Sequence, residues 1–189
     1  LKCSSPQEMY AVLTGAPTAA PEAPRPAETR SVAKPSTTPA GKRFRLDRYV
    51  RPELVLVDLP GDDKERAIDA LVNRAHESGL LSDLAAAREA ILARERSMAT
   101  GVSEGIAIPH ARTDAVQDLV CVIGLHRRGV DFQAVDGRPC RVIVLVLCPI
   151  ENPAPQIQLM AAISRGLTPS IRQRLFELSD PGEVAAFAA

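Results

Sequence analysis

The residues best suited to chemistry lie in one segment, residues 93–111, which reads ARERSMATGVSEGIAIPHA. In it His110 follows Pro109 and a short apolar stretch, Ile106 to Ile108. Proline fixes its own φ and biases the preceding residue toward extended backbone, so we expect His110 at a defined position at the end of a strand. A neutral imidazole, with an ordinary pKa of about 6.5, is a good nucleophile near neutral pH.

Groups that would stabilise a phosphoryl group occur close to this histidine in the sequence. A transferred phosphoryl group requires positive charge and N–H donors around its oxygens. Arg94, on a predicted helix, is a candidate because a guanidinium can donate two parallel hydrogen bonds. A loop of small and hydroxyl-bearing residues could approach a bound anion closely; it contains Thr100, Gly101, Ser103 and Gly105. The segment therefore predicts phosphoryl transfer to His110.

The other two histidines have simpler interpretations. His76 lies on a predicted amphipathic helix, which favours a solvated position. His126 ends a predicted core strand beside Arg127 and Arg128, which also favours the surface. The three histidines lack any recognisable zinc-ligand spacing, so no metal site is predicted.

Some basic residues also have alternatives that involve no chemistry. The pair Arg127-Arg128 is typical of a solvated turn, with docking of an acidic partner as the alternative. Gly41-Lys42 lacks the rest of a nucleotide-binding phosphate loop. Arg94, taken without its neighbours, could equally pair with a carboxylate on its own helix.

The elements that must position these residues alternate between helix and strand patterns. Glu53–Leu59 predicts a strand. Asp62 and Glu65 have capping-box spacing before a helix that ends near Gly79, and apolar residues recur along it at Ile68, Leu71, Val72 and Ala75. Ser82 is the predicted cap of a second helix, which carries Leu84, Ala87, Ile91 and Leu92.

Two near-continuous apolar runs, Leu119–Leu125 and Val142–Cys148, are typical of strands covered on both faces. Asp136-Gly137 between them indicates a turn. A third helix is predicted from Asn152-Pro153, packing Met160, Ile163 and Leu167, and a fourth behind Ser170, packing Ile171, Leu175 and Leu178. Helices flanking buried strands predict a layered α/β domain.

Composition narrows the classes of function. The chain has 189 residues, 46% of them hydrophobic but only 3% aromatic, which predicts an aliphatic core. Its 23 basic residues balance 23 acidic residues, so neither nucleic acid nor an anionic membrane surface is an expected partner. Cys121 and Cys148 lie in the apolar runs, and no cysteines form a CxxC pair, which suits reduced core thiols in the cytoplasm.

The first part of the chain differs in composition from the rest. Residues 15–42 are rich in proline, alanine, threonine and serine, so residues 1–42 are predicted to be an extended or disordered linker and residues 43–189 the domain. Residues 1–14 could form a short helix or the tail of an upstream region, and the start at Leu1 suggests a fragment of a longer protein. No secretory signal or membrane-length apolar run is seen, so a cytoplasmic location is expected, with a membrane-attached larger protein as the alternative.

GIAIPHA at Gly105–Ala111 resembles the active-site signature of the fructose/mannitol-type and nitrogen-type IIA domains of the bacterial sugar phosphotransferase system. The resemblance covers about residues 46–187. Further matching segments, in the family's order, are Arg94-Glu95, Thr100-Gly101, Gly129–Phe132, Asp136–Pro139 and Cys148-Pro149.

This resemblance implies a sandwich with a mixed, largely buried β-sheet flanked by helices. It also implies that His110 accepts a phosphoryl group from the carrier HPr and passes it to a IIB partner, that Arg94 stabilises the phosphohistidine, and that Thr100 belongs to the site. No metal or organic cofactor is implied.

One departure from the family concerns its second active-site histidine, which occurs in a His-Leu pair. The matching pair here is Gln156-Ile157. Glutamine donates hydrogen bonds but cannot become cationic, although a place in the first helical turn would keep some favourable dipole near the phosphate. We therefore expect phosphate acceptance on His110 and slow onward transfer. The alternatives are a regulatory module whose phosphorylation state controls a partner or fused domain, and a degenerate IIA fold that takes no phosphate.

Overall fold

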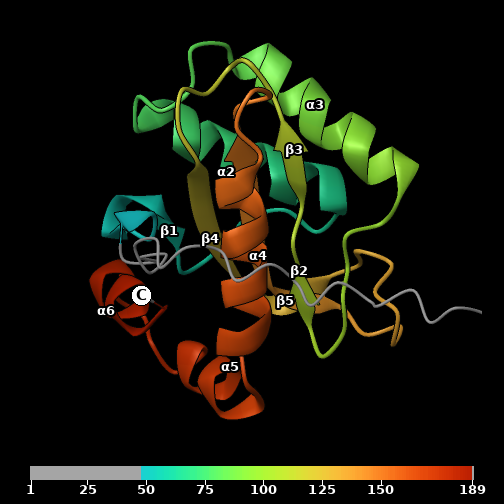
Figure 1. The fold of residues 1–189 in the computed structure, drawn as a ribbon. Coiled ribbons are helices and arrows are strands. Elements are labelled where there is room, and N and C mark those ends of the chain that lie inside the picture. The colour runs from blue at the N-terminus through green and yellow to red at the C-terminus, as the bar shows by residue number, and fades with distance from the viewer. Residues whose placement is uncertain (1–47, 189) are drawn as a thin grey trace, which may run out of the picture. The chain divides into compact units, whose positions relative to one another are not determined.

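The computed structural model describes residues 48–188, so the predicted linker, the short N-terminal helix and Cys3 lie outside the described residues. The elements follow each other along the chain (Figure 1) as a 3-10 helix η2 (Pro52–Leu54), β1 (Val55–Leu56), α2 (Lys64–Glu77), α3 (Leu84–Ser97), β2 (Ile106–Ala107), β3 (His110–Arg112), β4 (Val120–Val130), β5 (Cys140–Cys148), α4 (Ala154–Gly166), α5 (Pro169–Leu175) and α6 (Pro181–Ala188).

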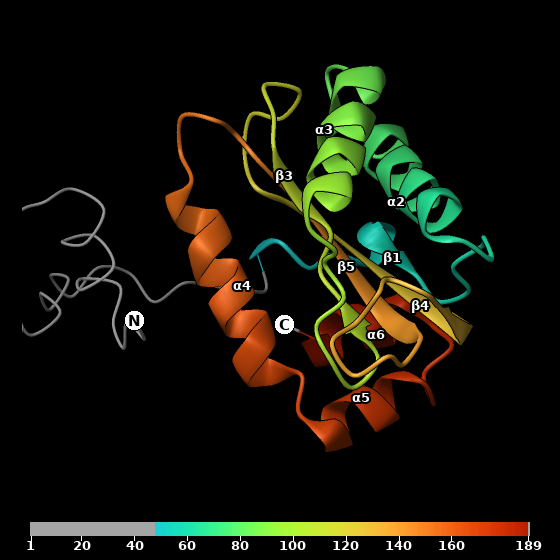
Figure 2. The same ribbon diagram turned by 90° about the vertical axis from the view of Figure 1, so that its right-hand side faces the viewer.

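The strands form one mixed sheet in the order β1-β4-β5-β2, and β3 also pairs with β5. The long strands β4 and β5 are antiparallel, whereas β1 runs parallel to β4, and β2 and β3 run parallel to β5. Helices α2 and α3 cover one face of the sheet and α4 covers the other (Figure 2). The predicted layered α/β fold with a mixed, helix-flanked sheet is confirmed.

The core consists of two aliphatic layers, one on each face of the sheet. Alternate residues of β5 serve the two layers: Ile143, Leu145 and Leu147 pack with α2 and α3. Val142, Val144 and Val146 pack on the opposite face with residues of α4 and α5. Because both faces are covered there, the runs Leu119–Leu125 in and before β4 and Val142–Cys148 in β5 are apolar, as the sequence predicted.

Several element boundaries differ from the prediction. The strand expected at Glu53–Leu59 is reduced to Val55–Leu56, because η2 precedes it and only these residues pair with β4. The strand expected at Leu119–Leu125 continues to Val130. Helix α6 was not predicted at all.

The helix caps also differ from the prediction, since a neighbouring residue takes each role. Asp63 rather than Asp62 caps α2 by accepting from Arg66 N–H at 2.8 Å. Asp83 rather than Ser82 caps α3, because the Ser82 hydroxyl donates to the Ala115 carbonyl instead. Thr168 rather than Ser170 caps α5.

Cysteines 121, 140 and 148 are buried and unoxidised in the strands. Burial raises the pKa of Cys121 to about 12 and is the main cause that raises the pKa of Cys140 to about 11. These thiols are therefore neutral at physiological pH, as expected of core residues. Among residues 48–188, no helix is long and apolar enough to cross a membrane.

Candidate functional site

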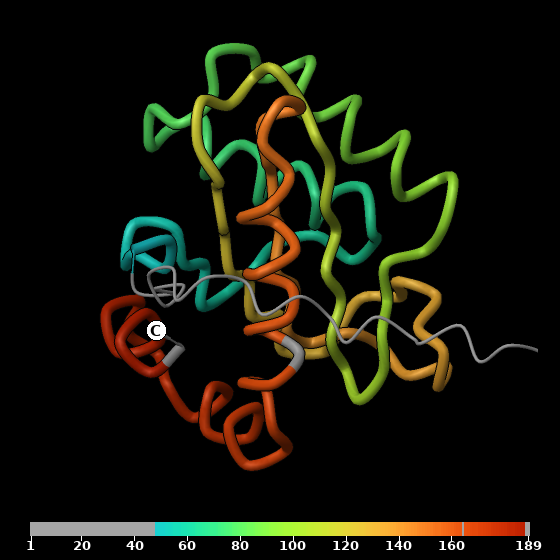
Figure 3. Tube along the Cα trace, viewed as in Figure 1, coloured from blue at the N-terminus to red at the C-terminus, as the bar shows by residue number. Residues whose placement is uncertain are grey.

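The strand β3 presents His110 at the edge of the sheet. Ile108 and Pro109 separate β2 from β3, and both short strands pair with β5. The pairing with β5 is therefore interrupted at Pro109 and starts again at His110. His110 pairs with Val146 and is half-buried. Helices α3 and α4 lie on the two sides of β3 (Figure 2), and the connection that leads from α3 into β2 can be followed in the tube drawing (Figure 3).

A backbone carbonyl fixes the protonation of the His110 ring. Nδ1 lies 2.8 Å from the carbonyl oxygen of Ile108. A carbonyl oxygen can only accept a hydrogen bond, so Nδ1 carries the proton in the neutral ring and Nε2 carries the lone pair. Nε2 is therefore the nucleophilic atom that this geometry offers.

A buried carboxylate holds the chain between α3 and β2. Both the N–H and the hydroxyl of Thr100 donate to Glu95, at 3.2 and 2.5 Å. Lys64 of α2 forms an ion pair with Glu95 at 3.3 Å, and only 3% of the Glu95 side chain is exposed. The Thr100 hydroxyl, predicted to face an anion, is thus engaged with a carboxylate.

This buried group is connected to the histidine through the backbone. The N–H of Ile108 donates to the carbonyl of Thr100 at 3.0 Å. The carbonyl of the same Ile108 accepts from the His110 ring. A continuous series of hydrogen bonds therefore runs from Glu95 to the imidazole of His110.

The glycines of the loop serve packing as well as flexibility. A Cβ on Gly101 would lie 2.6 Å from the carbonyl oxygen of Phe132, so only glycine allows these two backbone segments to approach. Asp136 accepts from the Glu104 N–H at 2.6 Å, and this bond is the main cause that lowers the pKa of the Asp136 carboxyl. The loop is thereby held against the turn before β5.

Arg94 lies in the last turn of α3, the helix that packs against β3. Its Nη1 donates to the carbonyl of Met98 at 2.9 Å, across the end of the helix. A guanidinium has five N–H donors, so this bond leaves others for an anion. The alternative of a carboxylate partner on its own helix is taken instead by Arg96, which pairs with Glu89.

Gln156 contacts an arginine that the sequence analysis did not single out, Arg112, two residues after His110. Gln156 is the third residue of α4 and is 5% exposed. Its side-chain oxygen accepts from Nε of Arg112 at 3.3 Å. The available signal was spacing: residues two apart on a strand share a face, and Arg112 follows His110 by two.

The thiol of Cys148 lies next to this pair but does not compete as a nucleophile. Burial raises the pKa of the Cys148 thiol, and the Gln156 N–H and the Arg112 charge offset only part of that rise. A thiol that stays protonated at neutral pH is a weak nucleophile.

Other residues considered in the sequence lie away from this site. His76 is exposed on α2, as predicted. The prediction that His126 lies at the surface was wrong: it is 7% exposed and lies within β4, not at its end. Arg127 pairs with Asp58, and Arg128 with Asp62.

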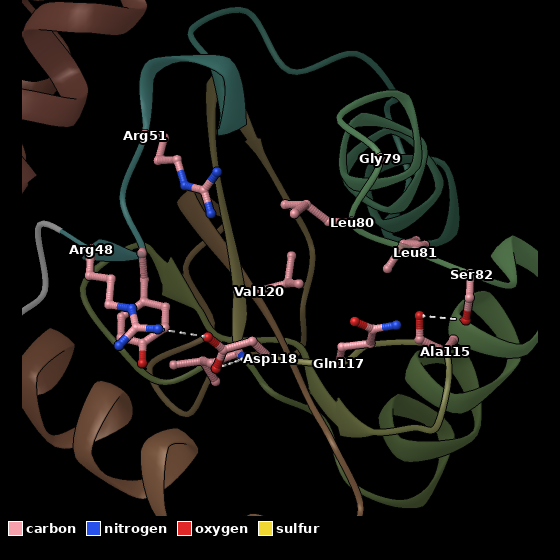
Figure 4. A pocket seen from close by; sticks show the side chains of 12 residues that line it. Arg48, Arg51, Gly79, Leu80, Leu81, Ser82, Ala115, Gln117, Asp118 and Val120 are labelled. Atoms are coloured by element: carbon pink, nitrogen blue, oxygen red, sulfur yellow. Dashed lines mark hydrogen bonds and ion pairs between the residues drawn. The ribbon is translucent and has the colours of Figure 1, made fainter.

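A separate hollow of about 410 Å³ lies between the α2–α3 turn and the segment before β4 (Figure 4). Arg48, Arg51, Leu80 and Gln117 line it, and Arg48 donates to Asp118 there at 3.3 Å. None of His110, Arg94, Arg112 and Gln156 contributes to its lining, so this hollow is not the candidate site.

Comparison with known proteins shows the family to which this chain belongs. Residues 48–188 match the family model described as phosphoenolpyruvate-dependent sugar phosphotransferase system, EIIA 2, and the chain belongs to this family. It is 36% identical over 126 residues to the fructose-specific EIIA component of Haloferax volcanii, covering 66% of this chain and 82% of that protein.

Two solved structures show the same fold. The nitrogen regulatory protein IIA-Ntr of Neisseria meningitidis has a TM-score of 0.70 and 26% identity, with 76% of this chain and 99% of that chain covered. The enzyme IIA for mannitol of Escherichia coli, solved in complex with phosphorylated enzyme IIB, has a TM-score of 0.60 and 21% identity, with 72% and 94% covered.

Proposed function

We propose that this domain accepts a phosphoryl group from an HPr-type carrier on Nε2 of His110 and passes it to a IIB partner in sugar uptake. The observation that carries the proposal is the hydrogen bond from Nδ1 to the Ile108 carbonyl, which leaves the ring lone pair on Nε2. Family membership supports phosphoryl transfer as the chemistry. The IIB partner of the mannitol relative supports the second step.

Exposed apolar side chains near the ends of α3 and α4 support docking of protein partners. Met98 follows α3 and is 65% exposed, and Ile157 follows Gln156 in α4 and is 63% exposed. Val102, in the loop before β2, is 46% exposed. These exposed apolar side chains, on the two helices that flank β3 and on the loop before β2, are the ones we expect a partner protein to contact.

The identity of the phosphorylated nitrogen tests this proposal. The full-length chain, labelled with ¹⁵N in histidine, is incubated with phosphoenolpyruvate, Enzyme I and HPr. We expect an acid-labile phosphoryl group on one histidine, with the large ¹⁵N shift at Nε2 of His110 and not at Nδ1. A chain that gains no phosphoryl group, or gains it at Nδ1, contradicts the proposal.

Arg94 is expected to stabilise the phosphoryl group, so Arg94→Gln should slow phosphorylation. Loss of one charge-assisted hydrogen bond predicts a rate about 10- to 100-fold lower. The matched control is Arg96→Gln, two residues later, whose partner is the exposed Glu89. Stopped-flow or quenched-flow assays measure the phosphorylation rate of both variants. Equal rates would mean that Arg94 only closes the end of α3, through its bond to Met98, and does not contact the phosphoryl group.

A regulatory role is the second candidate, favoured by the likeness to the nitrogen regulatory protein and by Gln156. In this case phosphorylation adds negative charge to the surface around His110 and changes binding to a target protein. Transfer from the phosphorylated domain to purified IIB proteins separates the two roles. Loss of the phosphoryl group to a IIB within seconds favours transport, and persistence with altered partner binding favours regulation.

A further inference from the structure

We propose that Arg112 is a catalytic residue of this site: its guanidinium contacts the phosphoryl group on His110 and supplies the positive charge that Gln156 cannot carry. This inference rests on the proposed phosphorylation of His110. With Arg112 included, the site has a cation in place of the second histidine of the family.

Strand geometry places the two residues on one face. His110 and Arg112 pair with Val146 and Cys148 of β5, which belong to the core layer on the α4 side. Ala111, between them, packs in the opposite layer. Residues two apart on a strand have Cα atoms about 6.5–7 Å apart, a distance that an arginine side chain spans. The guanidinium is thus within reach of a group on Nε2.

The contact with Gln156 orients both side chains. Arg112 uses Nε to donate to the Gln156 side-chain oxygen at 3.3 Å, across 44 residues of sequence. Its two terminal nitrogens, which form the fork that matches phosphate oxygens, remain as donors. Because the amide oxygen faces Arg112, the NH₂ group of Gln156 is directed elsewhere and can also donate.

Charge distinguishes this arrangement from a pair of histidines. A second imidazole carries positive charge only when it is protonated, and its ordinary pKa is about 6.5. A guanidinium is protonated at any pH that a protein tolerates. Slow transfer was expected because Gln156 itself carries no positive charge. The guanidinium of Arg112, bonded to Gln156, supplies that charge.

The transfer step proceeds without a proton relay. The Nε2 lone pair of His110 attacks phosphorus, the bond from phosphorus to the donor nitrogen breaks, and that electron pair returns to the donor. Positive charge develops on the imidazole, whose Nδ1 proton stays bonded to the Ile108 carbonyl. Negative charge on the phosphoryl oxygens is met by Arg112.

The test uses phosphoramidate as the donor, so that no carrier protein is required. Its P–N bond breaks as the phosphoryl group moves to His110, and ammonia leaves. On the full-length chain, Arg112→Gln should lower the phosphorylation rate about 10- to 100-fold, and Arg112→Lys should recover much of it because the charge returns without the fork. Arg127→Gln, which removes a charge paired with Asp58, is the matched control and should leave the rate unchanged.

A pH profile separates a catalytic role from a structural one. The groups around Arg112 are His110 on its strand, Gln156 on α4 and the thiol of Cys148, whose own surroundings also include Asp118. The rate of the Arg112→Gln/Gln156→His double variant is divided by the rate of Arg112→Gln at the same pH. Because both proteins contain His110, any effect of pH on His110 itself cancels in this ratio. Gln156→His added to Arg112→Gln should restore the rate at about pH 6 and not at about pH 8.5. Added to the native chain, Gln156→His should change the rate less than about threefold even at about pH 6, since Arg112 already supplies the charge.

Two outcomes overturn this inference while leaving the proposed function intact. One is an Arg112→Gln variant that matches the native rate while the native chain is phosphorylated on His110. The other is a variant that is slow but is not rescued by Gln156→His at low pH or by Arg112→Lys. If the native chain itself takes no phosphoryl group from phosphoramidate or phospho-HPr, the proposed function fails first.

Discussion

Replacing His110 with alanine is expected to abolish phosphoryl acceptance, lowering incorporation by more than about 1000-fold. Alanine has no lone pair that could form the bond to phosphorus, and the remaining groups of the site only stabilise what the histidine accepts. The nearby thiol of Cys148 cannot substitute, because burial raises its pKa and keeps it protonated. The measurement is phosphoryl incorporation by mass spectrometry after incubation with phosphoenolpyruvate, Enzyme I and HPr.

His76→Ala is the matched control, because this histidine is exposed on α2 and lies away from the site. The His76→Ala variant should be phosphorylated, on His110, at the rate of the native chain. Thermal unfolding of both variants shows whether the fold is retained. Incorporation that persists in a folded His110→Ala protein would place the acceptor elsewhere.

Replacing Glu95 with alanine is expected to destabilise the domain by about 3–5 kcal/mol, the range for breaking one side of a buried ion pair. The change leaves Lys64 without its buried partner, and it leaves the N–H and the hydroxyl of Thr100 without their acceptor. A domain of this size has roughly 5–15 kcal/mol of stability in total, so the loss is severe. Urea unfolding at neutral pH measures it.

Two variants define the cause of that loss. Glu95→Gln keeps the shape and one acceptor oxygen, so it should cost less, about 1–3 kcal/mol. Glu89→Ala removes an exposed carboxylate of the same helix that pairs with Arg96, and it should cost no more than about 1 kcal/mol. If Glu95→Ala is no more destabilising than Glu89→Ala, the buried group does not hold the loop.

The sequence predicted the parts of this fold that depend on local pattern. The apolar runs that became β4 and β5 are recognisable because strands covered on both faces need apolar residues almost throughout. Helices α2 and α3 were recognisable by the spacing of Ile68, Leu71 and Ile91. The cap residues were predicted wrongly because several residues near each helix start have side chains that can cap. A tertiary contact, such as the bond from Ser82 to the Ala115 carbonyl, decides which side chain is left to cap the helix.

The site was only partly predictable for a related reason. His110 and Arg94 occur in one segment with recognisable spacing, and Gln156 was found by its place in the family's pattern. The spacing of Arg112 from His110 is visible in the sequence, but its bond to Gln156 depends on how the fold brings α4 beside β3. The role of Glu95 likewise depends on Lys64 of another helix. Neither contact leaves a periodic signal in the sequence.

Hydrogen bonds run from Glu95 through Thr100 and Ile108 to His110. We therefore expect the histidine to be less mobile than the arginines of the site. Moving the His110 ring away from Ile108 breaks a hydrogen bond that leads back to a buried carboxylate, so we expect this ring to fluctuate little. The cations, in contrast, end long side chains that rearrange within nanoseconds. If His110 accepts the phosphoryl group as proposed, we therefore expect the arginines and the partner proteins, rather than the ring of His110, to adapt to different donors and acceptors.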